Sequence, residues 1–401
     1  MKLAYSTEQR ELRESVRRFL ADRVPLPRVR ELMESADGTD DKVWNYAGSQ
    51  LGLQGIAIPE EYGGAGFTFT EQAIVLEELG AALYPGPYLA SAVLAATALL
   101  ASSDEAAKAE LLPPIAGGET VATLAFTEDD GSWDPDAIRL AAAPASPVPA
   151  SPVPASPVPA SPVPASPVPA SPASAGTGWV LDGHKSFVLD GHTAGLILTV
   201  ARTDGGLSLF AVPAGAEGLT RAELPALDQT RGLARLEFTA TPARLIGGPG
   251  EAAAILSRTL DVAAVALAAE QLGGAQRALD MAVAYAKIRN QFGRPIGSFQ
   301  AIKHRCADLL LEVESLRSAV GYAAAAVAED SSEVPVVAAL VKALASDTYF
   351  HVAAENIQIH GGIGFTWEHD AHLYFKRAKA SELFLGDASY HRERLATRIG
   401  I

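Results

Sequence analysis

Cysteine is almost absent from this sequence, which has one, Cys306, among 401 residues. A single thiol excludes an internal disulfide and a zinc site built from several cysteines, and it fits a reducing cytoplasm. Cys306 lies within a helical pattern, where we expect a small core residue. Charge is also scarce, since 20% of residues are charged and 48% are hydrophobic. This composition predicts a globular protein with one large core or several domain-sized cores.

Positive charge is in deficit, with a formal net charge of −15 and a pI of about 5.0. Nucleic acids and anionic membranes bind basic surfaces, so neither is expected as a partner, although local Arg and Lys residues can still bind small anions. The N-terminal segment MKLAYSTEQRELRESVRRFL has charges throughout and lacks an apolar central run. This pattern is unlike a signal peptide or a membrane anchor. We therefore expect a soluble, cytoplasmic protein.

Helical periodicity predicts an N-terminal helical domain over residues 1–118. Ser6 is suited to cap a first helix, and Thr70 begins a second that we expect to end at a C-capping Gly80. Small and apolar residues over 91–103 predict a third helix that is buried between its neighbours.

Alternating hydrophobicity begins near residue 119 and predicts a middle β domain, barrel- or sandwich-like, over residues 119–243. A proline-rich low-complexity insertion, residues 144–173, interrupts it with five copies of Ala-Ser-Pro-Val-Pro. Such a segment cannot form a helix or a strand ladder, so we expect an extended polyproline-II-like excursion into solvent. Repeat expansion in a tolerant loop is favoured over a docking segment for a proline-recognising partner.

Helical periodicity returns over residues 244–401 in long blocks with short connections, which predicts an antiparallel four-helix bundle. The fold class is therefore α+β multidomain, with an N-terminal helical domain, a middle β domain and a C-terminal bundle. The predicted helical blocks are 251–292, 298–329, 333–360 and 368–386.

Two stretches of the middle domain have features of a ligand site. FTEDDGS (126–132) follows a strand, and its turn would offer hydroxyls and free backbone N–H groups to a planar or anionic ligand. DGHKSFVLDG (182–191) places the aromatic Phe187 where it could flank a ring system. The alternatives are an ordinary hairpin and a half-buried sheet aromatic.

Two stretches of the C-terminal region predict a phosphate site. In IRNQFGRPIGSFQAIKH (288–304), Arg289 and Arg294 lie near a chain break, and Ser298 can cap the following helix. In QIHGGIGF (358–365), glycines would let phosphates approach the backbone closely. The alternatives are a solvated basic turn and a glycine C-cap.

The last two stretches, extended as RNQFGRPIGSFQAIKH and QIHGGIGFTWEHDAHLYFKRA, resemble the signature of the acyl-CoA dehydrogenase family. The helix, β, helix order extends the resemblance over essentially the whole chain except the proline repeat. It implies FAD between the β domain and the bundle, in a dimer or a dimer of dimers, and α,β-dehydrogenation of an acyl-CoA thioester. In that reaction a carboxylate takes the α-proton, a β-hydride passes to flavin N5, and an electron-transferring flavoprotein accepts the electrons.

The resemblance also implies FAD contacts. Thr127 corresponds to a threonine that bonds the flavin ring, and Ser132 to a serine near the ligand phosphates. Phe187, Val188 and Leu189 stand where the family usually has Trp-Ile-Thr, so Leu189 removes one hydrogen bond worth about 1 kcal/mol. The residues that resemble contacts to the FAD of a neighbouring subunit are Arg289, Gln291, Phe292, Phe299, Gln300, Gln358, Gly361 and Gly362.

The catalytic glutamate of the family has no counterpart here. Leu385 stands at the usual position, and Ala263, thirteen residues before Gln276, stands at the alternative position, followed by Ala264 in place of a frequent arginine. Neither Leu385 nor Ala263 can accept a proton, so no catalytic residue is assigned.

Other carboxylates could substitute for the missing glutamate. Asp387, Glu382 and Asp261 lie near the two positions but are favoured as capping or surface acids. His369 and His372 are predicted to share a helical face; without a clear third ligand we expect polar contacts for them, and no metal site. The other histidines of this region, His360 and His391, invite the same interpretation.

Three hypotheses follow. The first is a FAD-dependent acyl-CoA dehydrogenase that uses a base of its own or of another subunit, similar to short bacterial members that form α2β2 heterotetramers, some with bulky steroid or other branched acyl-CoA substrates. The second is a non-catalytic partner subunit that holds another subunit's FAD. The third keeps the fold and changes the reaction, as in related flavin monooxygenases. The expected partners are an acyl-CoA, an electron-transferring flavoprotein and a second chain, in a homo-oligomer or a heterotetramer.

Overall fold

The computed structural model describes residues 5–145 and 178–401. The proline repeat lies almost entirely outside the described residues, so its conformation stays a prediction. On either side of it the chain forms an antiparallel pair, in which Pro144 lies opposite Trp179 and the amide of Ala145 donates to the carbonyl of Gly178 at 2.8 Å.

The N-terminal region is helical, as predicted. Ser6 caps the first helix through a reciprocal capping box: its hydroxyl accepts from the amide of Gln9, while the Gln9 side chain accepts from the amide of Ser6. The helices are α1 (Thr7–Arg23), α2 (Leu26–Met33), α3 (Asp41–Ser49), η1 (Glu60–Tyr62), α4 (Phe69–Ala81), the π-helix η2 (Leu89–Ala95), α5 (Ala96–Leu100) and α6 (Glu105–Ala116).

Gly80 does not cap α4, contrary to the prediction, because the helix continues to Ala81 and its C-cap is Ala82. Gly80 instead lets α4 cross α7 (Ala252–Ile288) in backbone contact, since a Cβ at this position would lie 1.9 Å from the carbonyl oxygen of Glu270. Gly273 makes the reciprocal approach from α7, where a Cβ would lie 1.7 Å from the carbonyl oxygen of Glu77. The two glycines therefore allow the backbones of α4 and α7 to approach closely.

The middle region forms one seven-stranded sheet, in which the pairing order β4-β2-β3-β7-β5 returns to β4 and closes a ring. Its interior is filled by apolar side chains such as Leu181, Ile197, Phe210 and Leu236, each fully buried. A closed ring removes exposed edges from these five strands. The strands are β1 (Ala122–Ala125), β2 (Ala141–Pro144), β3 (Trp179–Leu189), β4 (Leu196–Thr203), β5 (Gly206–Pro213), β6 (Leu219–Leu224) and β7 (Leu233–Ile246).

The C-terminal region is the predicted bundle with an additional helix. Ser298 does not cap α8, contrary to the prediction, because Phe299 is the N-cap residue and the Ser298 hydroxyl is buried without a partner among the described residues. Cys306, predicted to be a core residue, is half-buried. The elements are α7, the short strands β8 (Asn290–Gln291) and β9 (Arg294–Pro295), η4 (Ile296–Ser298), α8 (Gln300–Ala328), α9 (Val334–His360), η5 (Gly361–Phe365), α10 (Ala371–Leu383) and α11 (Ala388–Ile399).

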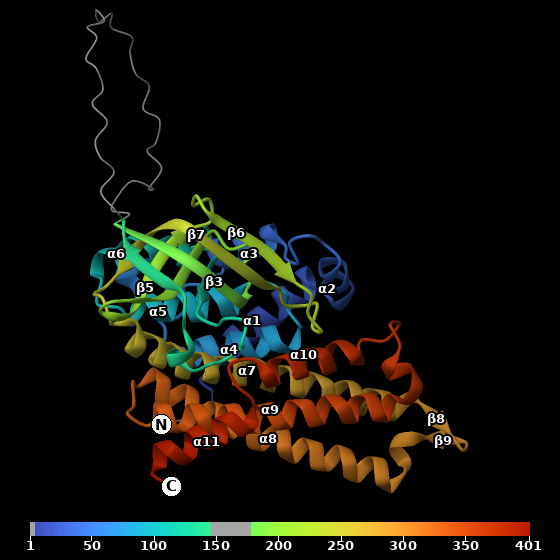
Figure 1. Cartoon of the computed structure of the whole chain (residues 1–401). Helices are drawn as coiled ribbons and strands as arrows, with labels where there is room; N and C mark the ends of the chain where they lie inside the picture. Colours follow the sequence, from blue (N-terminus) through green and yellow to red (C-terminus); the bar gives the residue numbers. More distant parts are fainter. Residues whose placement is uncertain (1–4, 146–177) are drawn as a thin grey trace, which may run out of the picture.

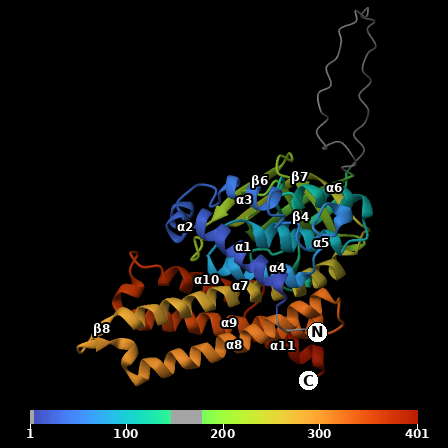
Figure 2. The ribbon, with the colours of Figure 1, turned by 180° about the vertical axis from the view of Figure 1, so that it is seen from behind.

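The β ring lies above the bundle in Figure 1, and the N-terminal helices cover the ring on the side seen from behind in Figure 2. The helix α7 runs between these layers and packs on both α4 and α9. Two helical segments, Ala252–Ile288 and Val334–Phe365, are long and apolar enough to cross a membrane. Their most apolar windows are 78% and 67% buried within the structure, as expected of core helices.

Candidate functional site

A pocket of about 490 Å³ lies between the β ring and α10. We call it the aromatic pocket because three aromatic side chains form much of its wall, together with aliphatic residues and a few charged groups. Apolar walls with a few polar groups are typical of cofactor sites. Its lining residues are Gly131, Trp133, Phe187, Ala226, Leu227, Asp228, Arg231, Leu233, Lys379, Ala380, Leu383 and Phe384.

Trp133 joins the two sides of the aromatic pocket. Its ring centroid lies 5.8 Å from that of Phe126 at the end of β1 and 5.5 Å from that of Phe384 after α10, the latter edge to face. Phe187 contributes from β3, where its backbone has a φ of 58° and its side chain stays 39% exposed. A non-glycine residue in this conformation costs energy and marks functional sites more often than ordinary strands. The pocket thus offers aromatic surfaces suited to a planar ring.

The polar wall of the aromatic pocket belongs to a buried ionic cluster. Arg377 of α10 is 2% exposed and donates to Asp228 at 2.6 Å, to Glu270 at 2.8 Å and to the carbonyl of Thr230 at 2.9 Å. Arg231 also pairs with Glu270. Burial would lower the pKa of Arg377, but Asp228 and Glu270 outweigh it and raise that pKa. The cluster fixes the loop between β6 and β7 against α7 and α10.

A much smaller cavity lies on the other side of Arg231. Its polar wall consists of Asp190, Thr230, Arg231 and Glu270, and it is just large enough for about one water molecule. Burial raises the pKa of Asp190 to about 7, although the nearby arginines act to lower it. Leu189 lines this small cavity rather than the aromatic pocket.

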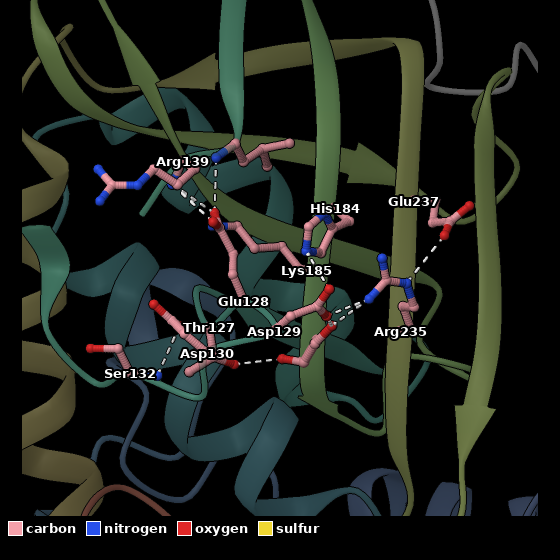
Figure 3. A network of polar contacts seen from close by, with 12 residues as sticks. Thr127, Glu128, Asp129, Asp130, Ser132, Arg139, His184, Lys185, Arg235 and Glu237 are labelled. Carbon is pink, nitrogen blue, oxygen red and sulfur yellow. Dashed lines mark hydrogen bonds and ion pairs between the residues drawn. The ribbon is translucent and has the colours of Figure 1, made fainter. Parts of the chain in front are cut away.

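The turn of residues 127–132 is closed on itself (Figure 3). The amide of Ser132 donates to the Asp130 carboxylate at 3.0 Å, and the amide of Gly131 donates to the carbonyl of Glu128 at 2.9 Å. The predicted free N–H groups at these two positions are therefore already used. The Thr127 hydroxyl likewise donates to the Ser186 carbonyl at 2.6 Å.

Acidic side chains in this turn are held by basic partners from the sheet (Figure 3). Lys185 is fully buried and donates to Glu128 at 2.9 Å, while Arg235 and His184 pair with Asp129. Burial lowers the pKa of Lys185 to about 8 despite this partner. Burial would raise the pKa of Glu128, but hydrogen bonds from Lys185 and from backbone amides outweigh it and lower that pKa. The turn is thus rigidly anchored and presents negative charge.

The residues predicted to contact the FAD of a neighbouring subunit, from Arg289 to Gly362, form a second group. They belong to the end of the bundle that carries β8, β9 and η5 (Figure 1). The Tyr285 and His360 rings stack at 4.2 Å and hold the α7 and α9 ends together. Within residues 5–145 and 178–401, no carboxylate pairs with Arg289. All members are exposed except the half-buried Phe299, and none of them lines the aromatic pocket. A single chain therefore does not bring the predicted flavin contacts of the β domain together with the group around Arg289. This separation is expected if the two groups contact the FAD molecules of different subunits.

Leu385 and Ala263 are both buried in the main hydrophobic core, at 3% and 0% exposure. The backbone at Leu385 has a φ of 63° and is fixed from two sides: Lys342 donates to the carbonyl of Gly386 at 3.0 Å, and His391 lies 2.8 Å from the carbonyl of Leu385. The segment that would present a base is therefore well formed, but it presents an aliphatic side chain.

The acids near these two positions have structural partners. Asp261 is neither a capping nor a surface acid, contrary to the prediction, because two arginines bind it in the interior of α7. Asp387 caps α11 by accepting from the amide of Tyr390 at 2.8 Å. Asp261 is buried and bound by Arg398 at 2.8 Å and by Arg394 at 3.3 Å. Glu382 pairs with Lys379 at 3.0 Å.

The histidines do not form a metal site in the described part of the chain, where no group of three or more candidate ligands occurs. His369 precedes α10 and does not share a helical face with His372, contrary to the prediction. Its Nδ1 instead accepts from the amide of Ala371 at 3.1 Å. Burial lowers the pKa of His391 to about 3 and keeps that ring neutral.

Family models match two parts of the chain: the acyl-CoA dehydrogenase N-terminal domain over residues 6–119 and the C-terminal domain over residues 252–400. The acyl-CoA dehydrogenase IpdE2 of Mycobacterium tuberculosis is 35% identical over 392 residues, covering 98% of this chain and 97% of that protein. The chain belongs to the acyl-CoA dehydrogenase family. It is accordingly an oxidoreductase of a flavoprotein family, as the resemblance implied.

Solved structures agree with this assignment. A variant of the steroid acyl-CoA dehydrogenase Tcur3481-Tcur3483 superposes with a TM-score of 0.82 at 31% identity and covers 98% of each chain. The ChsE4-ChsE5 complex of Mycobacterium tuberculosis superposes with a TM-score of 0.84 at 28% identity, covering 100% of this chain and 99% of that one. Each is named after two components, and the second is described as a complex. The predicted fold class is confirmed.

Sequence reasoning found Phe187 but missed Trp133 and Arg231, which line the same pocket, and Glu270 and Asp190, which line the small cavity next to Arg231. Trp133 directly follows Ser132, so its position beside a predicted ligand turn was a usable signal. The other three are ordinary charged residues in the sequence. They come together only through the crossing of α7 beneath the β ring.

Proposed function

We propose that this chain is one subunit of a FAD-dependent acyl-CoA dehydrogenase that introduces an α,β double bond into an acyl-CoA thioester, with the base supplied by a partner chain. The observation that carries the proposal is the burial of Leu385 and Ala263 in the hydrophobic core. A proton acceptor must reach the substrate α-carbon, and neither position offers one. This chain is then the non-catalytic member of the pair with respect to proton abstraction.

The residues present fit a flavin, because the aromatic pocket has aromatic walls and enough volume for a ring system. When bound, FAD supplies the hydride acceptor of the reaction. Trp133, Phe187 and Phe384 would bind the ring and exclude water, and Arg231 would provide a positive charge at its edge. Thr127, Val188 and Leu189 are buried and do not line the pocket, so they would act on a bound flavin only through their neighbours.

Arg289 and its neighbours would bind the phosphates and adenosine of a FAD held mainly by the partner. An exposed arginine without a carboxylate partner in the described chain is suited to a phosphate group. The glycines Gly361 and Gly362 have open space where a side chain would be, so a ligand could approach their backbone. Gln291, Phe292, Phe299, Gln300 and Gln358 would complete this surface.

The resemblance to the acyl-CoA dehydrogenase family also motivates the proposals on oligomeric state, substrate, electron acceptor, location and domain boundaries. The two-chain complexes among the structural neighbours support a hetero-oligomer over a homo-oligomer, and the steroid acyl-CoA dehydrogenase supports a bulky acyl group on the substrate. We assign an electron-transferring flavoprotein as acceptor and the cytoplasm as location. We also propose domain boundaries near residues 118 and 243. Ser132 is assigned near the ligand phosphates, although the acidic turn around it opposes a bound anion.

Co-purification tests the proposal. The chain is expressed alone and together with the product of an adjacent gene, and FAD content and acyl-CoA oxidation are measured. We expect FAD retention and oxidation only in the assembled complex. Full FAD occupancy and turnover by the lone chain would refute the need for a partner.

A variant tests the role of this chain in the assembled complex. Arg289→Ala should lower FAD retention at least about tenfold, because a charge-assisted hydrogen bond to phosphate is lost. Arg244→Ala is the matched control, since Arg244 is paired with Glu110 at 2.6 Å and lies outside both groups. Unchanged FAD content in Arg289→Ala would count against the assignment. Oxygen consumption with hydroxylated product would indicate the monooxygenase alternative instead.

A further inference from the structure

A third cavity, of about 390 Å³, lies among the loop before α4, the helices η2, α5 and α7, and the C-terminal end of α8. We call it the alanine-lined cavity because its wall includes Ala57, Ala92, Ala96, Ala101 and Ala328. It shares no lining residue with the aromatic pocket or with the small cavity beside Asp190. Its volume falls within the range of small-molecule sites.

The shape of this cavity depends on an unusual local backbone. The segment η2 is a π-helix of seven residues, and its Ala92 carbonyl accepts a hydrogen bond from the side chain of the buried Gln72 at 3.1 Å. π-Helical turns are rare and occur frequently at functional sites. Here the π-helix contributes Leu89 to the small cavity and Ala92 to the alanine-lined cavity, so it separates the two.

The wall of the alanine-lined cavity carries positive charge only, among the residues that the structure describes. Arg258 is the single charged side chain among the described residues that line the cavity. Its partner Asp330, at 2.6 Å, has a side chain that is 86% exposed, whereas that of Arg258 is 35% exposed. Exposed ion pairs of this kind contribute little stability, so an incoming anion can replace Asp330. The rest of the wall is mainly aliphatic, with Ile58 and Val262 almost fully buried.

We propose that the alanine-lined cavity binds an apolar chain or ring system that ends in an anionic group, with the apolar part among the alanines and the anion on Arg258. A free carboxylic acid has this chemistry directly; an acyl-CoA has it when its phosphates, which lie beyond a neutral thioester and the pantetheine arm, reach Arg258. The site is distinct from the proposed flavin pocket and does not rest on the proposed function.

Fluorescence titration of the purified full-length chain tests the proposal, with cis-parinaric acid as probe and its methyl ester as the uncharged comparison. We expect the acid to bind at least about tenfold more tightly than the ester, because only the acid forms a charge-assisted bond with Arg258. Equal binding of acid and ester, or binding of neither, would overturn the assignment.

Variants locate the site. Ala101→Trp and Thr97→Phe both fill the cavity from its more accessible wall, and each should weaken binding of the acid at least about tenfold. Two such variants keep the test valid if one folds poorly, which circular dichroism reports. Full affinity in both folded variants would place the probe elsewhere and refute the proposal.

Two charge variants should act in opposite directions. Arg258→Gln should reduce affinity for the acid to that of the ester, whereas Asp330→Asn should tighten binding of the acid up to about fivefold by releasing Arg258. Asn suits this position because Asp330 has a φ of 48°. Arg244→Gln is the matched control and should change nothing. A loss of affinity in Asp330→Asn would contradict the role given to Arg258.

Competition then separates the two sources of ligand. Octadecanoic acid and octadecanoyl-CoA are each titrated against bound cis-parinaric acid. Displacement by either supports the shared chemistry and tells which form the cavity accepts. Displacement by neither would refute the proposal.

Discussion

Asp190 should make the stability of this protein depend on pH in a way that one substitution removes. Its carboxyl group lines the small cavity with Arg231 and Glu270, and burial raises its pKa from 3.8 to about 7. The folded protein therefore holds a proton on Asp190 that the unfolded chain releases at lower pH. A raised folded-state pKa stabilises the protein at low pH, and this contribution is lost as the pH rises toward 7.

The size of this pH dependence follows from the shift in the pKa of Asp190. Each pH unit between the unfolded and the folded pKa changes the free energy of unfolding by about 1.4 kcal/mol. From pH 5 to pH 8 the protein should lose about 2.7 kcal/mol through Asp190, because the change ends near the folded pKa of about 7. Most of the loss should occur below pH 7, and little above it.

Asp190→Asn removes the titrating group with minimal change of shape. Asp190 has a φ of 52°, a conformation that Asn adopts as readily as Asp. We expect the variant to gain about 2.7 kcal/mol relative to the wild type on going from pH 5 to pH 8. Other groups titrate alike in both proteins, so their contributions cancel in the difference.

Urea unfolding followed by far-ultraviolet circular dichroism measures this difference at both pH values. Asp204→Asn is the control, since Asp204 is an exposed turn residue and its variant should track the wild type at both. If the stability difference between Asp190→Asn and the wild type is the same at pH 5 and pH 8, the raised pKa is refuted.

Two further substitutions test packing and the buried cluster. Gly273→Ala should destabilise the protein by more than about 2 kcal/mol, because its Cβ would overlap the carbonyl of Glu77 where α4 and α7 cross; Gly362→Ala, which has open space at its Cβ, controls for the loss of glycine in a thermal unfolding scan. Arg377→Met should cost about 3 to 5 kcal/mol in urea unfolding, because it leaves the buried Asp228 without its arginine; a loss below about 1 kcal/mol would show that the cluster is not a stabilising contact.

Hydrophobic periodicity was sufficient to predict the architecture because it changes from helical to alternating near residue 119 and back to helical near residue 244. Long apolar helical runs placed α7 to α10 within a few residues, and short alternating runs placed β1 to β5 and β7 in the middle region. The elements that were not predicted include α2, α3, α6, β6 and α11, which have at most 12 residues each, so their periodic signal is weak. Gly80 was misassigned because a glycine at a helix crossing and a glycine at a C-cap look alike in one sequence.

The candidate site was less predictable because much of it depends on hydrogen bonds between residues far apart in sequence. The turn around Ser132 was predicted to offer free amides, but the amide of Ser132 donates to the carboxylate of Asp130. Nothing local indicates that Arg231, from a loop, would pair with Glu270 of α7, or that Trp133 would reach Phe384. Such contacts arise from tertiary packing and cannot be read from spacing alone.

The geometry around Leu385 explains how the fold is kept with an aliphatic residue at this position. Lys342 and His391 bond to backbone carbonyls of the segment, so its conformation does not depend on the side chain at position 385. A carboxylate there would have to be buried beside aliphatic neighbours, which is costly without a partner, whereas leucine adds apolar contact to the core. Once another chain supplies the base, stability alone favours the aliphatic residue. Arg289 lies outside this effect because its side chain is exposed. Trp133 and Phe384 of the aromatic pocket pack against the same core as Leu385.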